Sequence, residues 1–339
     1  TSLAFIGILW VQLIIGGKII AALGGVDYWI GVLILGLVAG IYVILGRFSA
    51  LLHTDVYQGI FMWVSLYIFV IYIFFGGSYS FDIGTILGEI GELSVSASES
   101  FIIDPTAITI FLGTTIAAFA GPDIWQRVTF AENNFEVRRG TRLAGIAMLL
   151  FILPLLLLAT DVYSIIGIPP AAEVDPLRFY AENLGQLARD LPMWVQITFT
   201  IGLLSAFLST ADTAVMLVAS SILNEWYRKK NIDGQELPIK EFQIIVLIII
   251  TTGILLASFY EDASEYFSGV LNILAAQGLP FLFLLFNRGN KIVINFALIT
   301  GALIAILLTF VWPDYNSGYY ILLPFIPGLL CFFGKNVNK

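Results

Sequence analysis

Cysteine, histidine and charged residues are all scarce in this chain of 339 residues. Its one cysteine, Cys331, excludes a disulfide within the chain, and its one histidine, His53, leaves no cluster of ligands for zinc or copper. Charged residues make up only 12% of the chain, too few to cover the surface of a soluble domain of this size. The net charge of −8 does not favour binding to nucleic acid.

Hydrophobic residues fill 59% of the chain and gather in blocks that short polar segments separate. Blocks of about 17–25 apolar residues are typical of helices that cross a membrane, and not of a membrane β-barrel. We therefore expect an all-α integral membrane protein with about ten transmembrane helices. The expected helices are residues 2–23, 28–46, 57–76, 106–121, 141–162, 193–225, 242–258, 265–286, 292–312 and 319–333.

The basic residues are distributed unevenly between the loops. If the expected helices alternate across the membrane, 13 of the 16 basic residues lie on one side: Arg47, Arg127, Arg138, Arg139, Arg142, Arg228, Lys229, Lys230, Lys240, Arg288, Lys291, Lys335 and Lys339. The positive-inside rule makes that side cytoplasmic. We expect a multi-pass protein of the plasma or inner membrane, with both ends of this chain in the cytoplasm.

A polar stripe interrupts the apolar run of residues 193–223. At 3.6 residues per turn, five of its side chains fall on or near one helix face: Ser205, Ser209, Asp212, Thr213 and Ser220. Such groups are costly in a membrane, so they usually face a pathway, a partner or an ion, and oxygen ligands suit a hard cation. Hydrogen bonds between helices explain Ser205 and Ser220 as well, whereas Asp212 needs a cation, a proton or a basic partner.

A second polar segment, residues 46–59, links the second expected helix to the third. Asp55 lies where the third helix is expected to begin. Two interpretations carry equal weight from the spacing. Either Thr54 or Asp55 caps the helix, or the Asp55 carboxylate reaches into the helix bundle.

A third motif, Gly121-Pro122-Asp123, ends the fourth expected helix. Such a break within a membrane is tolerated where it lines a cavity or is buried in protein, and it is also a pointer to transporter binding sites. The alternative is a capped helix end that Arg127 anchors at the lipid surface.

Together and in this order, the three motifs resemble the sodium:solute symporter family, which includes sodium–proline, sodium–pantothenate, sodium–sialic acid and sodium–glucose carriers. The matching residues are Gly46, Ala50 and Thr54-Asp55-Val56-Tyr57-Gln58, then Gly121-Pro122-Asp123-Ile124-Trp125-Gln126-Arg127, then Ser209-Thr210-Ala211-Asp212-Thr213. The resemblance implies the LeuT-type inverted-repeat helical bundle. Residues 1–339 would form a single transporter domain, with core helices three to ten and two C-terminal helices. Because the chain begins at Thr1, almost inside an apolar run, we expect the N-terminal helices to be missing from it.

The resemblance also implies the binding residues. One sodium ion would lie against the carbonyl of Ala206 and the hydroxyls of Ser209 and Thr210, with its remaining ligands on the missing first core helix. A second sodium would use Asp55, Ser209, Asp212 and Thr213. Three further polar residues of the apolar runs are candidates to face the substrate, although each is explained as well by a packing hydrogen bond: Gln12, Asn272 and Gln277.

The function that follows is sodium-coupled symport of a small organic solute by alternating access. Sodium would be the only metal, no other cofactor is implied, and the partners are the solute, sodium and the lipid bilayer. The sequence contains no nucleophile–base pair of an enzyme. One alternative is a proton-coupled carrier in which Asp55 and Asp212 relay the proton, and another is a transporter-like sensory membrane module.

Overall fold

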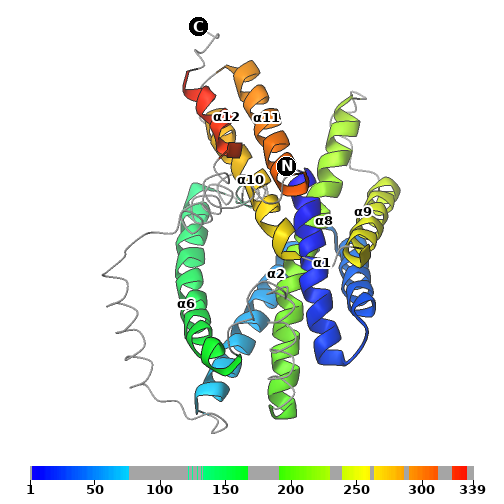
Figure 1. Cartoon of the computed structure of the whole chain (residues 1–339), viewed down its shortest axis with the longest axis vertical. Coiled ribbons are helices and arrows are strands. Elements are labelled where there is room, and N and C mark those ends of the chain that lie inside the picture. Colours follow the sequence, from blue (N-terminus) through cyan, green and yellow to red (C-terminus); the bar gives the residue numbers. More distant parts are fainter. Residues whose placement is uncertain are drawn as a thin grey trace, which may run out of the picture. The chain divides into compact units, whose positions relative to one another are not determined.

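The structure is a computed structural model (Figure 1), and it describes residues 2–75, 121, 124, 128, 131, 133–166, 191–229, 239–259, 263–285, 290–311 and 323–333. Every regular element within these residues is a helix, which confirms the all-α prediction. The chain divides into two compact units. The first unit comprises residues 1–11, 103–130 and 213–339, and the second comprises residues 12–102 and 131–212.

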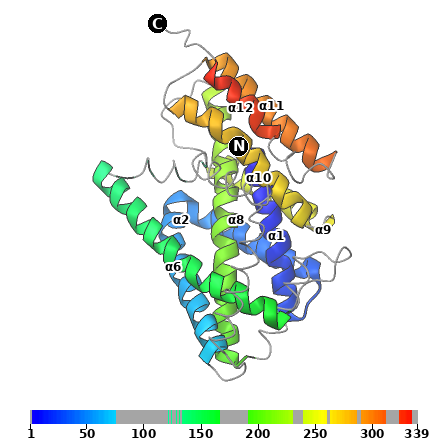
Figure 2. The same cartoon turned by 60° about the vertical axis from the view of Figure 1, so that its left-hand side comes forward.

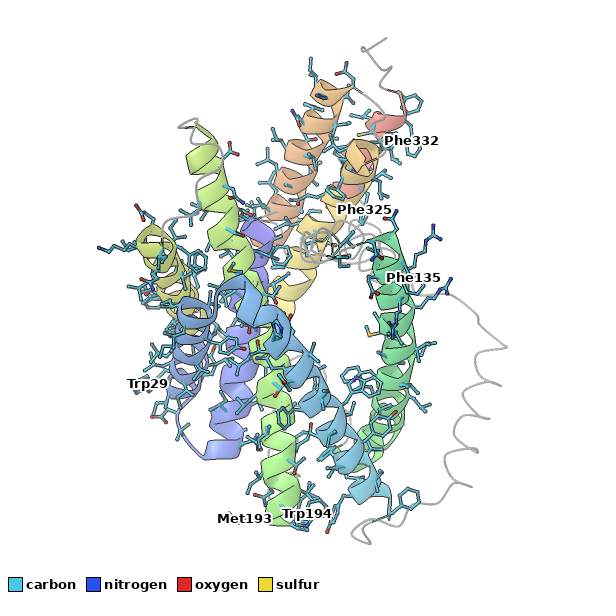
Figure 3. All side chains as sticks on the ribbon, turned by 180° about the vertical axis from the view of Figure 1, so that it is seen from behind. Trp29, Phe135, Met193, Trp194, Phe325 and Phe332 are labelled. Carbon is cyan, nitrogen blue, oxygen red and sulfur yellow. The ribbon has the colours of Figure 1, made fainter. Side chains whose placement is uncertain are left out.

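Six segments of the described residues are long and apolar enough to cross a membrane: Ser2–Gly24, Tyr28–Gly46, His53–Ile73, Met193–Glu225, Ile239–Phe259 and Lys291–Leu308. Large apolar side chains cover their outer faces, among them Trp29 and Trp194, which are 55% and 57% exposed (Figure 3). Exposed apolar surface on this scale requires lipid around it. The chain is therefore a multi-pass membrane protein. The count of ten stays a prediction, and the expected helix 106–121 lies outside the described residues.

Helices α1 (Ser2–Gly24) and α2 (Tyr28–Phe75) are joined by a tight turn. Gly25 at this turn has φ +62°, a left-handed conformation that glycine adopts without strain. Beyond the turn the two helices touch through glycines, because a Cβ atom added at Gly31 would overlap the carbonyl oxygen of Gly17. This contact holds the second half of α1 against the start of α2.

Two segments between residues 28 and 76 are long and apolar enough to cross a membrane, as predicted, but the expected link between them is itself helical, so α2 continues through residues 47–56. That segment contains no proline, so nothing in it removes a backbone donor from the helix. A straight helix of 48 residues would be about 72 Å long, more than twice the roughly 30 Å of the bilayer core. Figure 2 shows that α2 changes direction between its two halves, each of which is one membrane span.

Helix α6 (Asn134–Ile166) begins seven residues before its expected start at residue 141. The side chain of Asn133 caps it, since the backbone N–H groups of Phe135 and Glu136 both donate to Asn133 Oδ1 at 3.0 Å. Hydrophobic periodicity could not reveal this polar first turn. Helices α8 (Met193–Lys229) and α9 (Ile239–Phe259) likewise extend a few residues beyond their expected bounds.

In the first unit, α10 (Ala263–Leu285), α11 (Lys291–Phe310) and α12 (Ile326–Leu329) pack side by side (Figures 1 and 2). Residues Ile294, Ala297 and Cys331 form the buried contact between α11 and the 3₁₀ turn Leu330–Phe332. The described part of the expected helix 319–333 is an apolar helix, Leu323–Phe332, as predicted. This part consists of short α and 3₁₀ turns, because prolines at 324 and 327 have no N–H to donate.

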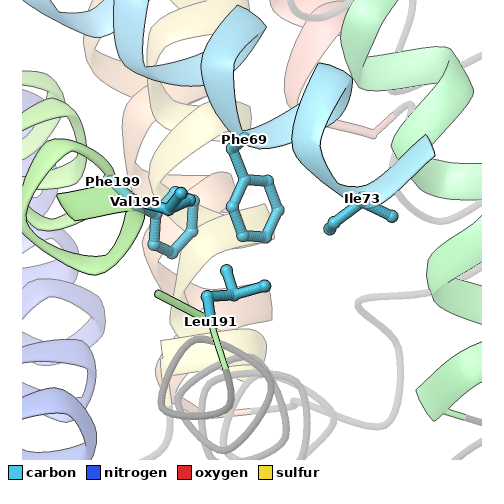
Figure 4. Packing of buried hydrophobic residues seen from close by; sticks show 5 residues of the cluster. All are labelled: Phe69, Ile73, Leu191, Val195 and Phe199. Carbon is cyan, nitrogen blue, oxygen red and sulfur yellow. The ribbon is translucent and has the colours of Figure 1, made fainter. Parts of the chain in front are cut away.

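In the second unit, a cluster of five buried side chains joins α2 to the start of α8: Phe69, Ile73, Leu191, Val195 and Phe199 (Figure 4). The rings of Phe69 and Phe199 stack, with centroids 4.1 Å apart and 17° between their planes. The Tyr67 hydroxyl connects α2 to α6, since it donates to the Leu150 carbonyl oxygen at 2.9 Å. The second half of α2 is therefore fixed against the helix that carries the polar stripe.

Candidate cation site

The polar stripe lies on one uninterrupted helix, α8. Asp212 is fully buried at 0% exposure, and Ser205 and Ser220 are each 8% exposed. Ser205 Oγ donates to the Ile201 carbonyl oxygen at 2.8 Å and Ser220 Oγ to the Leu217 carbonyl oxygen at 3.1 Å. These bonds satisfy both hydroxyls within the helix itself, which supports a structural role for the two serines.

Asp55 and Ser209 are brought together from helices far apart in the sequence. Ser209 Oγ donates to Asp55 Oδ1 at 3.2 Å. Asp55 lies inside α2 and not at its start, so the interpretation of Asp55 as a helix cap is wrong. Its carboxylate instead reaches the neighbouring helix. The contact places one carboxylate oxygen beside one hydroxyl oxygen, both of which are ligands that a hard cation prefers.

A second pair of oxygens on α8 belongs to the Thr210 hydroxyl and the Ala206 carbonyl. Thr210 Oγ1 donates to the Ala206 carbonyl oxygen at 3.3 Å. The carbonyl therefore already accepts a hydrogen bond, and as an ion ligand it would use its other lone pair. Thr210 is exposed and Ala206 is half-buried, so both residues are less buried in the protein than Asp212.

The separation of the oxygens permits a cation between or beside them. Ligands that lie 2.3–2.6 Å from a hard ion and at right angles are about 3.3–3.7 Å from each other. Of the two observed separations, 3.3 Å for Thr210 and Ala206 lies at the short end of that range, and 3.2 Å for Ser209 and Asp55 lies just below it. They equally suit hydrogen bonds, so an ion would replace these bonds with little movement of the side chains.

Gln58 belongs to the same region, and sequence reasoning did not assign it a role. Its Oε1 atom is buried and accepts no hydrogen bond within the described part of the chain. A buried amide oxygen without a donor costs about 1–3 kcal/mol, and a cation would supply its missing partner. Gln58 follows Asp55 by three residues, which places both on one side of α2. This spacing is the signal that could have identified it.

The remaining predicted residues are less informative. Thr213 follows Asp212 on α8 and is half-buried. The three substrate candidates lie on two helices of separate units: Gln12 on α1, and Asn272 and Gln277 on α10. Asn272 is 6% exposed, which suits either a packing hydrogen bond or a contact with solute. Their grouping around one solute stays a prediction, and most of the motif at residues 121–127 lies outside the described residues.

Comparison with known proteins gives two matches. The sequence model described as the sodium:solute symporter family matches residues 1–307. The sodium/pantothenate symporter of Escherichia coli (strain K12) is 23% identical over 339 aligned residues, which cover 96% of this chain and 67% of that relative. The family match therefore extends over both compact units and includes Asp55 and the whole polar stripe of α8.

Proposed function

The chain belongs to the sodium:solute symporter family, and from this premise we propose that it moves a small organic solute across the cell membrane together with sodium, by alternating access. The observation that carries the proposal is the contact between Asp55 on α2 and Ser209 on α8. In this proposal the contact is one edge of a sodium site, with Asp212, Thr213 and the Gln58 amide oxygen close by in sequence. Ser209, Thr210 and the Ala206 carbonyl contribute to the other predicted ion position.

Ligands from two helices make sodium binding sensitive to how those helices are placed. An ion held by both α2 and α8 binds most tightly in the conformation that brings its ligands together, and it shifts the population toward that conformation. In the proposed cycle sodium favours the outward-open state and completes the solute site. Inward opening then releases both.

The driving force for such a cycle is the sodium gradient together with the membrane potential. Each sodium ion that moves inward releases about 2.3 kcal/mol of free energy per 100 mV of membrane potential. Coupling needs no covalent step, so the chemistry assigned to these residues is binding and release of an ion. We also propose the LeuT-type bundle of about ten helices, which places such sites near the bilayer midplane.

Uptake measurements test the proposal directly. The complete gene product, reconstituted in proteoliposomes, should accumulate solute when sodium is supplied outside at fixed pH, and not when choline replaces sodium. The relative named above makes pantothenate the first solute to test. Accumulation driven by a pH gradient without sodium would instead favour the proton-coupled carrier, and a signalling response without uptake would favour the sensory module.

Asp55→Asn is the variant that tests the site. It removes one charge from the proposed ligand shell and should raise the sodium concentration for half-maximal uptake by about tenfold or more, as expected for loss of a charged partner. Asp27→Asn is the matched control, because Asp27 is exposed in the turn between α1 and α2. An unchanged sodium response in a well-folded Asp55→Asn protein would contradict the site.

A further inference from the structure

Helices α2 and α8 lie in close contact at Ser65 and Gly202. Ser65 is 5% exposed, and its hydroxyl bonds to its own helix, donating to the Met62 carbonyl oxygen at 3.2 Å. Its side chain fills the space beside Gly202 so completely that a Cβ atom added there would overlap both the Ser65 Cβ and Oγ atoms. The Phe61 carbonyl oxygen would lie 3.6 Å from the same Cβ. Only a residue without a side chain fits at this point of α8.

This close contact lies between two other contacts of the same helices. Phe69 stacks on Phe199 on one side of it, and Asp55 accepts the Ser209 hydrogen bond on the other. Residue numbers fall along α2 as they rise along α8, so the two segments pack antiparallel. From Ser65 to Asp55 is ten residues, or about 15 Å along a helix. The close contact of Ser65 with Gly202 therefore lies between the stacked rings of Phe69 and Phe199 and the candidate cation site.

A contact of this kind sets the distance between two helices. Small residues let helix backbones approach, and in membranes, where lipid is as apolar as the side chains, such packing largely determines how helices associate. Ion ligands tolerate displacements of only about 0.2 Å from their preferred distances. A methyl group inserted between Ser65 and Gly202 would move or rotate α2 against α8 by more than this.

We propose that Gly202 and Ser65 are positioning residues that hold α2 and α8 at the separation required for Asp55 and Ser209 to bind one sodium ion. Neither residue contacts the ion in this proposal. The inference rests on the proposed function, since it assumes that the Asp55–Ser209 contact is a sodium site.

The experiment measures sodium binding without any solute. Purified complete gene product is titrated with sodium chloride, choline chloride keeps the ionic strength constant, and the rise in melting temperature gives the half-saturating sodium concentration. Gly202→Ala should raise that concentration by about tenfold, a typical consequence of overpacking. The control is Gly59→Ala in α2, where an added Cβ meets no atom within 4 Å, and it should change the concentration less than about twofold.

Compensating changes at Ser65 separate positioning from general damage. Ser65→Gly removes both overlapping atoms, so the pair Gly202→Ala with Ser65→Gly should restore the half-saturating concentration to within about threefold of the unaltered protein. Ser65→Ala keeps the overlapping Cβ atom, so its pair with Gly202→Ala should stay impaired. The melting temperature without sodium reports folding in every variant.

Each outcome decides the matter. A sodium-specific loss in Gly202→Ala, restored by Ser65→Gly, supports the proposal. Equal responses of Gly202→Ala and Gly59→Ala overturn it and leave the proposed function standing. A lower melting temperature without any change in half-saturating sodium also overturns it, because the contact would then serve stability alone. If sodium and choline act alike on the unaltered protein, the proposed function fails, and this inference fails with it.

Discussion

Among single residues, Asp55 and Ser209 matter most, because their contact is the point at which two helices could share an ion. Their oxygens lie 3.2 Å apart, although 154 positions separate them in the sequence. Thr210 differs from Ser209, since its hydroxyl bonds within its own helix to the Ala206 carbonyl. The two adjacent hydroxyls therefore face different surroundings and should respond differently to substitution.

Ser209→Ala removes the hydroxyl that donates to Asp55 Oδ1, and we expect the larger effect from this variant. The loss should correspond to about 1–3 kcal/mol, seen as a higher sodium concentration for half-maximal uptake. Thr210→Ala should raise that concentration too, whereas Thr210→Ser keeps the oxygen and should leave it unchanged. Normal sodium dependence in a well-expressed double alanine variant would disprove the assignment.

Asp212 is the residue that distinguishes sodium from proton coupling. It is completely buried one turn beyond Ser209, so its charge depends strongly on what lies beside it. If Asp212 helps to bind sodium, Asp212→Asn should weaken the sodium dependence of uptake at every pH. Loss of the pH response with an intact sodium response would identify Asp212 as a proton site. Uptake measured over a grid of sodium concentrations and pH values separates the two results.

At the scale of elements, α2 is held against the start of α8 by two pairs of aromatic rings, Phe69 with Phe199 and Tyr72 with Trp194. Phe69 is fully buried and stacks on Phe199, and the Tyr72 and Trp194 rings meet edge to face beside them, with centroids 6.0 Å apart. Removing Phe69 would leave a cavity near the C-terminal end of α2, 14 residues beyond Asp55. The cluster thus contributes mainly to stability and only indirectly to the site.

Phe69→Ala should therefore lower the melting temperature of the purified protein. Truncating a buried aromatic ring lowers the free energy of unfolding of a soluble protein by about 3–5 kcal/mol. We expect a smaller loss here, about 2 kcal/mol, because lipid is as apolar as the side chains and burial from lipid gains less free energy than burial from water. Phe135→Ala is the control, since Phe135 on α6 is 70% exposed and its loss should cost less than about 0.5 kcal/mol. Equal melting temperatures for the two variants would show that the cluster is not an anchor.

For the whole molecule, the uneven distribution of basic residues predicts the orientation in the membrane. Arg138, Arg139 and Arg142 are exposed around the first turns of α6, next to the Asn133 cap. By the positive-inside rule, we predict that this end of α6 lies in the cytoplasm. The start of α8, with exposed Met193 and Trp194, then lies at the outer surface, where aromatic side chains are common.

Labelling of single cysteines tests this orientation. In a Cys331→Ala background, which removes the one cysteine of residues 1–339, Glu136→Cys should react with an impermeant thiol reagent only from the cytoplasmic side. Met193→Cys should react only from outside the cell. Intact cells and inverted membrane vesicles give the two accessibilities. Labelling of both positions from one side would show that the helix alternation is wrong.

The sequence by itself determined the membrane class, the all-helical architecture and the family, because long apolar runs have few other solutions and the three motifs keep their order and spacing. It also placed Asp212 and Ser209 on one face, which 3.6 residues per turn dictates. Only the tertiary structure decided that α2 is continuous and that Asp55 is no helix cap, and it showed the contact of Asp55 with Ser209 that the family resemblance had implied. These depend on packing between segments far apart in the chain, and spacing along one helix carries no information about which other helix lies beside it.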